Sequence, residues 1–308
     1  MVVITKQLGS LWRMFQTVIP SGWLSRIRES AFFRYQRARE LARTSKRLDI
    51  CAAQFAHVLH LAGPISLEGK TCLEVGAGWV LSHALVCHLL GAAQVIAADI
   101  QPQAEPRALD IAVRESIGSL PREILSPFAE PARIRERFAG LTSIPRFGFD
   151  ALTSLGILYQ SPVDFSRQKP AGEFDFIYSF SVLEHVPEAQ VGNLLGNLAA
   201  SLKPGGIMLH CIHLEDHQDI EGRPFDFLGL AGQAYGPGME SSRGNRLRAS
   251  AWFRLFSALG GVQSTVLYAH ERTERGLPGT IDPRVSFTDE HDLRISHLGV
   301  LSRKPALG

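Results

Sequence analysis

Cysteine is scarce in this sequence and long apolar runs are absent, and both shortages narrow the class of protein. Only four of the 308 residues are cysteines, and they form no CxxC pair. Since Cys72 and Cys211 lie inside apolar, strand-like runs, we expect buried, reduced thiols and a cytoplasmic protein. No apolar run approaches the roughly 20 residues of a membrane span. The first residues also lack the apolar core and small-residue cleavage site of a secretory signal, so none is expected.

What the chain does contain is enough apolar material for a sizeable core. Hydrophobic residues make up 45% of the sequence and charged residues 20%. A chain of this length holds one large α/β domain with additions, or two small domains.

A short apolar strand that runs into two closely spaced glycines is the strongest signal. Residues 71–80 read TCLEVGAGWV, and Asp99 closes the next apolar run. Glycine is usual where the backbone turns sharply or approaches a ligand, because it lacks a Cβ that would clash. An acid about 20 residues later, at the end of the neighbouring strand, is placed to accept hydrogen bonds from ribose hydroxyls. The pattern predicts an adenosine cofactor.

The residues around the glycines distinguish between two adenosine cofactors, a dinucleotide and S-adenosylmethionine. A dinucleotide site needs a third glycine, three residues after the second, so that the helix packs closely and the pyrophosphate binds its N-terminus. That place is Leu81, and the bulky Trp79 also suits a phosphate cradle poorly. Glu74, two residues before the first glycine, would oppose a pyrophosphate but suits a ligand with an ammonium group and a sulfonium. S-adenosylmethionine carries both and is the expected cofactor.

Later segments of the chain extend this interpretation by their order. ILYQSPVDF ends in Asp164-Phe165, EFDFIYSFSVLEHVPE spans residues 173–188, and LKPGGIMLHCIH spans residues 202–213. With the glycine segment and Asp99, they resemble the motifs of class I S-adenosylmethionine-dependent methyltransferases of the small-molecule, type 11-like branch. The frequent third glycine of the first motif is Val80 here. The resemblance implies cofactor contacts from Glu74, Val75, Gly76, Ala77, Gly78, Asp99, Ile100, Asp164, Phe165 and Ser179.

Strand-like and helical segments alternate, which predicts a doubly wound, Rossmann-like α/β sheet with N-terminal helices. We expect seven mainly parallel strands, the last antiparallel, near residues 70–75, 94–99, 156–160, 174–179, 206–212, 262–271 and 293–302. We divide the chain into a basic N-terminal helical arm (1–62) and a methyltransferase domain (63–308). The domain would contain a helical insertion at 121–150 and a substrate-side loop region at 214–248. Ligands bind at the carboxyl ends of such strands.

Two histidines just beyond the fourth and fifth strands are candidates for a catalytic base. The sulfonium already activates the methyl group, so the protein mainly holds an acceptor atom in line behind it. A hydroxyl acceptor also needs a base, and His185 and His213 suit that role because histidine titrates near neutrality. Alternatively, His185 only caps the turn before Pro187. His213 begins the cluster His213-x-x-Asp216-His217, which binds a metal or is a solvated loop.

We do not expect a metal. Glu184-His185 fits part of the ExxEH pattern with which some quinone-pathway methyltransferases hold a divalent cation, but Ser181 replaces the earlier acid. Substrate contacts are expected from Asp216, His217, Arg246 and Arg248, the arginines as a clamp for an anionic group or as an ordinary exposed helix start. The expected reaction is methyl transfer to a small molecule, as O-methylation of a glycan, lipid or secondary-metabolite precursor.

Charge is unevenly distributed along the chain. Residues 1–50 carry +7, whereas the whole chain carries +2. Two interpretations of this basic arm remain: a cap over the cofactor, as is common in the family, or a peripheral contact with an anionic membrane or acidic partner. A nucleic-acid substrate is not expected, because basic residues beyond the arm form no stripe with aromatics and the pI is near 8.4. The amino-methylating motif, an Asn or Asp followed by Pro-Pro and an aromatic, is also replaced by residues 179–182, SFSV.

Two other classes stay open at this point. A nicotinamide-dependent oxidoreductase would bind its own cofactor in place of S-adenosylmethionine. A non-catalytic interaction protein with the methyltransferase fold would not depend on Glu74 or Asp99.

Overall fold

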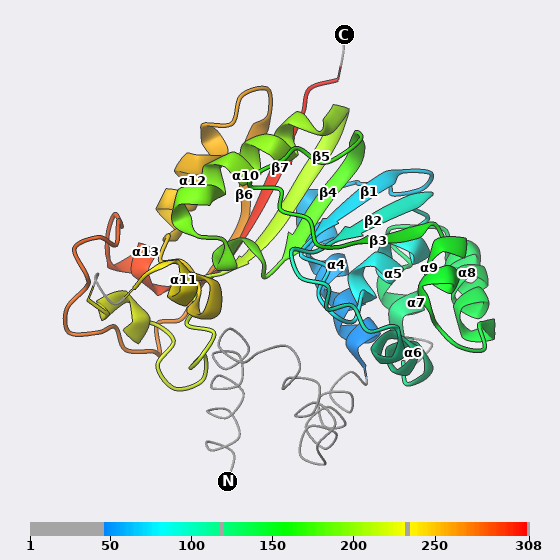
Figure 1. Cartoon of the computed structure of the whole chain (residues 1–308), viewed down its shortest axis with the longest axis horizontal. Helices are drawn as coiled ribbons and strands as arrows, with labels where there is room; N and C mark the ends of the chain where they lie inside the picture. Colours follow the sequence, from blue (N-terminus) through cyan, green and yellow to red (C-terminus); the bar gives the residue numbers. More distant parts are fainter. Residues whose placement is uncertain (1–45, 117–119, 232–234, 307–308) are drawn as a thin grey trace, which may run out of the picture. The chain divides into compact units, whose positions relative to one another are not determined.

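Among the residues that the structure describes, seven strands form one mixed sheet (Figure 1). The computed structural model describes residues 46–116, 120–231 and 235–306. The strands are β1 (Thr71–Val75), β2 (Gln94–Ala98), β3 (Ile157–Gln160), β4 (Phe174–Phe180), β5 (Leu202–His213), β6 (Gln263–Glu271) and β7 (Ile295–Arg303). Their order is β3-β2-β1-β4-β5-β7-β6, and β7 runs antiparallel to β5 and β6, whereas the pairs from β3 to β5 are parallel. The predicted mainly parallel sheet with an antiparallel last strand is confirmed.

Strand β1 lies in the middle of the parallel part, between β2 and β4. Leu73 pairs with Ile96 on one side and Ile177 on the other. Strands buried on both faces read as continuous apolar runs, which explains the composition of these segments. Glu74 breaks the run, and an acid is rarely buried without a special partner.

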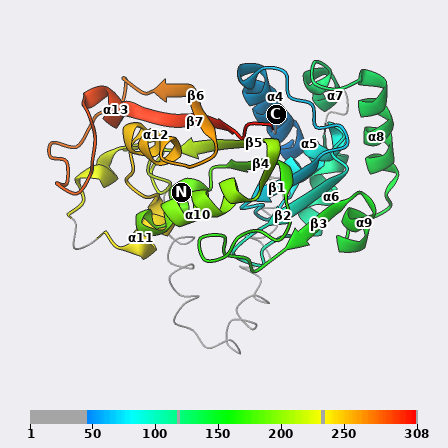
Figure 2. The same cartoon turned by 90° about the horizontal axis from the view of Figure 1, so that it is seen from above.

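Helices cover both faces of the sheet (Figures 1 and 2). The first face carries α4 (Arg47–Ala62), α5 (Ser82–Leu89), α6 (Pro106–Arg114), α7 (Leu120–Leu125), α8 (Pro131–Ser143) and α9 (Phe149–Ser154). Their apolar side chains share one core with Cys72, Val95 and Tyr178 of the strands. The second face carries α10 (Glu188–Ala200) and α12 (Ala249–Ser257), which share another core with Leu73 and Ile177.

Helix α4 lies within the predicted arm of residues 1–62, but it belongs to the compact unit of residues 46–308. Its Phe55 is fully buried, with its ring centroid 5.1 Å from that of Tyr178 in β4. The rest of the arm lies outside the described residues. The stretch 121–150, expected as a helical insertion, contains most of α7, all of α8 and the start of α9, and Ile134 and Leu141 are buried in the core of the first face.

The loop region after β5 contains short helices and a small core of its own. The elements are η2 (Asp226–Gly229) and α11 (Pro237–Arg243), and α13 (Glu290–Arg294) precedes β7. Phe225, Phe227 and Leu228 of this region pack with Val285 and Leu293 from the connection between β6 and β7. Two segments that are distant in sequence therefore support each other.

All four cysteines fall within the described residues and are free and buried, as expected. None of the helices among the described residues is long and apolar enough to cross a membrane.

Candidate active site

A glycine turn follows β1 at the carboxyl edge of the sheet. Gly76 and Gly78 have φ values of +73° and +66°, a region that residues with a Cβ seldom occupy. A Cβ added to Gly76 would lie 2.5 Å from Cγ2 of Val182, so the turn after β4 packs directly against it. A Cβ added to Gly78 would meet no described atom within 4 Å. Gly76 thus allows close packing, whereas Gly78 allows a left-handed turn beside open space.

Asp99 is joined to this turn by a hydrogen bond. The main-chain N–H of Gly78 donates to Oδ2 at 2.8 Å, and the N–H of Gln101 donates to Oδ1 at 2.8 Å. These bonds hold the carboxylate at the end of β2. Oδ2 also accepts from Nε2 of Gln103 at 3.3 Å, whereas Oδ1 keeps a further lone pair. The predicted pairing of glycine turn and acid is therefore a direct contact. It leaves Asp99 able to accept from ribose hydroxyls.

Glu74 is a buried acid at the end of β1. The hydroxyl of Tyr178 donates to Oε2 at 3.2 Å, and Oε1 lies 3.7 Å from Nδ1 of His83. Burial raises the pKa of Glu74 to about 8 and lowers the pKa of His83 to about 3. Both side chains are therefore neutral at pH 7, and the 3.7 Å contact is not an ion pair. A cationic ligand would favour the ionised form of Glu74.

Asp164 and Phe165 form a turn after β3. Oδ1 of Asp164 accepts from the N–H and the hydroxyl of Ser166, at 2.9 and 2.6 Å. Phe165 is buried, and its carbonyl accepts from Asn197 of α10 at 2.9 Å. The Asp164 side chain keeps 27% exposure, and Ile100 is 59% exposed at the end of β2. An adenine ring would thus meet an acceptor at Asp164 and an apolar surface at Ile100.

Ser179 lies in the core and not at the open edge, contrary to the expectation from the sequence. It is fully buried, and its Oγ is 2.8 Å from Nδ1 of His210 in β5. The His210 ring packs against Phe256 of α12, with ring centroids 5.7 Å apart. Burial lowers the pKa of His210 to about 3, so this pair is a neutral core hydrogen bond. Ser179 does not present its hydroxyl to a ligand in this arrangement.

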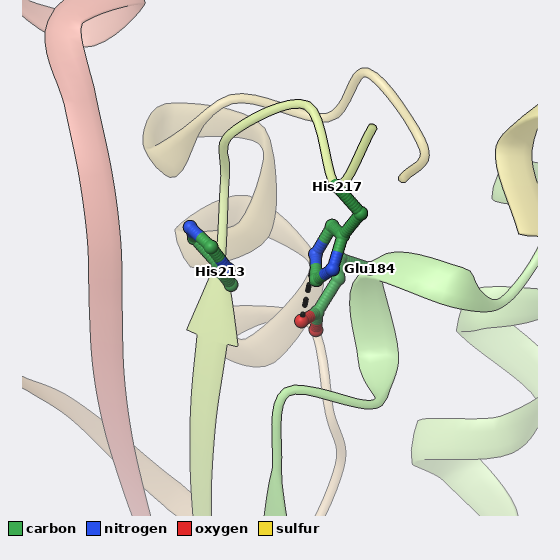
Figure 3. A group of neighbouring side chains, drawn as sticks. All are labelled: Glu184, His213 and His217. Carbon is green, nitrogen blue, oxygen red and sulfur yellow. Dashed lines mark ion pairs between the residues drawn. The ribbon is translucent and has the colours of Figure 1, made fainter. Parts of the chain in front are cut away.

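The two predicted bases, His185 and His213, meet at the carboxyl ends of β4 and β5. His185 ends the short helix η1 (Leu183–His185), and His213 ends β5. His217 lies between them, with its ring centroid 4.3 Å from His185 and 4.7 Å from His213. Its Nε2 is 3.4 Å from Oε1 of Glu184 (Figure 3). The cluster thus contains the two predicted bases and the predicted substrate residue His217. It also contains Glu184, which was not predicted as a site residue.

Hydrogen bonds orient both predicted bases. Nδ1 of His185 donates to the carbonyl of Ser241 at 3.0 Å, because a carbonyl can only accept, so Nε2 keeps a lone pair. Nε2 of His213 likewise donates to Oε2 of Glu215 at 2.6 Å, so this bond orients the ring through Nε2 and does not involve Nδ1. Burial lowers the pKa of His185, so its ring is neutral near pH 7. His185 thus offers one unprotonated nitrogen, Nε2.

Asn245 fixes the position of η1. Its side-chain amide donates to the carbonyls of Leu183 and Val186, at 3.0 and 2.8 Å. Its main-chain N–H donates to the carbonyl of Glu184 at 2.5 Å. The segment before α12 therefore holds the turn after β4 in place.

Two of the predicted substrate residues have structural roles. Asp216 is fully buried and pairs with Arg243 of α11. Arg248 is also fully buried, and its guanidinium donates to the carbonyls of Leu214 at 2.8 Å and Ile295 at 2.6 Å. Arg248 therefore ties the loop after β5 to the start of β7, and it does not clamp a substrate.

Arg246 and His217 occupy different places. Arg246 is 8% exposed, donates to the carbonyl of Leu230 at 2.7 Å, and lies over the ring of Tyr235 at 4.3 Å. Its Nη2 is 3.7 Å from Asp282. His217 belongs to the histidine cluster, because its ring contacts those of His185 and His213. Among the described residues it is the one substrate candidate of the four with such a contact.

The sequence interpretation missed several residues of this site. Glu215 follows His213 by two positions, and its spacing in HLEDH was the available signal. His297 of β7 stacks on His213 with ring centroids 4.3 Å apart, and Asn245 reaches Leu183 of η1 from 62 residues away. No local sequence pattern predicts the contacts of His297 and Asn245, because their partners are distant in the sequence.

The fold and this edge define a doubly wound α/β protein with a glycine turn on one side and a histidine cluster on the other. A family model described as "Methyltransferase domain" matches residues 33–260. The chain therefore belongs to this methyltransferase family. It is an S-adenosylmethionine-dependent methyltransferase, which removes the oxidoreductase and non-catalytic alternatives.

The chain is also similar to solved structures. An S-adenosylmethionine-dependent methyltransferase from Mesorhizobium loti shares 16% identity over 81% of this chain and 98% of its own, with a TM-score of 0.42. The YcgJ protein from Bacillus subtilis shares 12% over 82% and 100%, with a TM-score of 0.42. The N-methyltransferase NodS from Bradyrhizobium japonicum WM9, in complex with S-adenosyl-L-homocysteine, shares 14% over 91% of each chain, with a TM-score of 0.36. No curated protein matches the sequence.

Proposed function

We propose that this protein methylates an oxygen atom of a small molecule. The observation that carries the proposal is that His185 and His213 flank His217 at the ends of β4 and β5, with a neutral imidazole at His185. A hydroxyl acceptor must lose a proton as it attacks, and a neutral imidazole takes it. The contact between Val182 and Gly76 joins the turn that carries His185 to the predicted cofactor turn.

The cofactor side of the proposal assigns each residue a task. Glu74 faces the ammonium group, Asp99 accepts from the ribose hydroxyls, and Asp164 accepts from the exocyclic amine of adenine. Val75, Gly76, Ala77 and Gly78 form the turn along the cofactor, and Ile100 and Phe165 supply apolar contacts. Support comes from the buried acid, the left-handed glycines and the pinned carboxylate.

The chemistry of the transfer places few demands on the protein. S-adenosylmethionine supplies a methyl group activated by the sulfonium. The acceptor oxygen forms a bond to the methyl carbon as the sulfur–carbon bond breaks, and the hydroxyl proton passes to Nε2 of His185 or Nδ1 of His213. Correct positioning of the oxygen supplies most of the barrier reduction.

The acceptor would bind between the histidine cluster and the loop region of residues 214–248. Arg246 stays a candidate for its outer part, since it is slightly exposed. A glycan, lipid or secondary-metabolite precursor is the class we propose. Nucleic acid is not proposed, for the reasons of charge and motif given by the sequence.

The test is release of S-adenosylhomocysteine against a pooled library of small molecules with hydroxyl groups. His185→Gln and His213→Gln should each lower kcat by about 10²- to 10⁴-fold while leaving the Kd for S-adenosylmethionine unchanged. The exposed His60 of α4 provides a matched control, and His60→Gln should turn over like the wild type. Wild-type turnover of both test variants on a hydroxyl acceptor would show that neither histidine is the base.

A further inference from the structure

Glu184 is a fully buried carboxylate that lacks a hydrogen-bond partner among the described residues. Its side chain is 1% exposed, and neither Oε1 nor Oε2 accepts a hydrogen bond there. Nε2 of His217, 3.4 Å from Oε1, is buried and makes no hydrogen bond to a described residue either, so the ion pair drawn in Figure 3 is its contact with Glu184. Buried polar groups are normally paired, and a buried charge without a counter-charge is expensive. A bound cation would give the oxygens of Glu184 and Nε2 of His217 the partner that they lack among the described residues.

His213 completes a group that could surround such a ligand (Figure 3). One ligand atom from each of Glu184, His213 and His217 lies within 4.8 Å of the other two. The three residues come from η1, the end of β5 and the following loop, and their side chains converge. The main chain of Glu184 is fixed by Asn245, and the N–H of His217 donates to the carbonyl of Arg243 at 3.0 Å.

We propose that Glu184, His213 and His217 bind a divalent transition-metal ion of the zinc class. Two imidazoles and one carboxylate are donors that suit Zn²⁺, whereas Mg²⁺ and Ca²⁺ prefer sites made of oxygen atoms. Three protein ligands leave a coordination position open for another group. This set differs from the ExxEH pattern weighed in the sequence, because both histidines follow β4 by more than 30 residues and His185 is not a ligand. It replaces the expectation that no metal is bound.

The surroundings of His213 match those of a metal ligand. A ligating histidine usually donates its other ring N–H to a carboxylate, which fixes the ring and makes the ligating nitrogen more basic. Nε2 of His213 donates to Glu215 at 2.6 Å and leaves Nδ1 for the ion. Glu215 is itself anchored by Arg272 at 2.6 Å.

A second group with suitable spacing, His213, Glu215 and His297, is less suited to an ion. Both carboxylate oxygens of Glu215 are already engaged, one by His213 and the other by Arg272. Binding there would break these bonds, whereas binding at Glu184 satisfies unpartnered atoms. The ion therefore belongs with Glu184.

The metal site gives the two candidate bases different tasks, a consequence that rests on the proposed function. An acceptor hydroxyl at the open position would bind a Lewis acid and lose its proton more easily. His213 would then hold the ion, and His185 would take the proton.

The experiment measures metal binding without any acceptor. The full chain, purified without a histidine tag and stripped with a chelator, is titrated with Zn²⁺ in competition with a chromophoric chelator, and bound zinc is counted by mass spectrometry. The wild type and the control His60→Ala should hold one ion per chain. Glu184→Gln and His217→Ala should bind at least about 100-fold more weakly, because even outer-shell partners cost about 10- to 100-fold. Glu215→Gln should weaken zinc binding by about 10- to 100-fold, as expected for a residue that contacts a ligand and not the ion.

Two controls separate this proposal from the proposed function and from misfolding. S-adenosylmethionine affinity and the thermal midpoint are measured on every variant, and Co²⁺ absorption in the visible range reports histidine and carboxylate ligation in the wild type. No zinc on the wild type at micromolar concentration, or equal zinc on well-folded Glu184→Gln, would overturn the site. If Glu184→Gln does not fold, the Co²⁺ spectrum of the wild type and of Glu215→Gln decides. An intact zinc site without methyl transfer would count only against the proposed function.

Discussion

Asp99 receives a main-chain hydrogen bond on each carboxylate oxygen, so its geometry is set before any ligand arrives. Asp99→Asn removes the negative charge and places an amide donor against a main-chain donor. Losing a charged acceptor typically costs about 1.5–3 kcal/mol. We therefore expect the Kd for S-adenosylmethionine to rise about 10- to 100-fold, as measured by isothermal titration. The exposed Asp150 of α9 is the control, and an unchanged Kd for Asp99→Asn would exclude the ribose role.

The proposed contact of Glu74 with the cofactor would make cofactor binding depend on pH. Its pKa in the free protein is raised to about 8 by burial, so the side chain is protonated below that pH. If it faces an ammonium group, binding favours the ionised form and must release a proton. Affinity should therefore increase as pH rises from about 6 to about 8, and then level off. Titration in buffers of different ionisation enthalpy counts the proton, and Glu74→Gln should abolish its release. Equal proton release by that variant would assign it to another group.

How far the residues of the site could be predicted depends on whether their partners are local. The glycine turn and Asp99 follow from spacing, because the ends of two adjacent strands must meet. Arg248 could not be assigned from sequence, since arginine is usually exposed and its carbonyl partners lie at residues 214, 292, 293 and 295. Glu184 was not expected to bind a metal, because Ser181 replaces the first acid of the ExxEH pattern. Its neighbours in the structure are His213 and His217, at and after the end of β5.

At the scale of elements, two asparagines hold the two sides of the site. Asn245 supports η1, and Asn197 of α10 supports the carbonyl of Phe165. Asn245→Ala removes the side-chain bonds to the carbonyls of Leu183 and Val186, of which the first keeps the N–H of Val186 as a donor. It should lower kcat at least tenfold with little change in the Kd for S-adenosylmethionine, because it loosens the turn that carries Glu184 and His185. Asn197→Ala should do the reverse and raise that Kd. Steady-state kinetics and titration on both variants check the pair. Identical effects of the two substitutions would contradict this division.

The strands were predicted well because their apolar runs are continuous. The starts and ends of β1, β2, β3 and β4 lie within one residue of the expected positions. Strand β5 begins at Leu202 and not near 206, since Leu202 pairs with Phe174 before the register shifts. The short helices η2 and α11 had no periodic signal, because their apolar partners lie in another segment.

At the scale of the whole molecule, the role of residues 1–45 is still a prediction. Residues 46–308 form a compact unit with its own cores. A chain lacking residues 1–45 should therefore keep a cooperative thermal transition. If the arm is a cap, that chain binds S-adenosylmethionine more weakly, and neither protein sediments with anionic vesicles. Cosedimentation of the full chain alone, reversed by salt, would establish the membrane interpretation instead.

The core shared by the loop region of residues 214–248 and the connection between β6 and β7 limits how this enzyme can be re-engineered. Phe225 and Phe227 pack against Val285 and Leu293, and Arg248 bonds the main chain at the start of β7. The proposed acceptor side is thus built from two segments that share one core, while the proposed cofactor side lies on β1, β2 and β3. A graft of residues 214–248 from a relative would expose or clash with half of that core. To change the acceptor, both segments must be exchanged together as a single cassette.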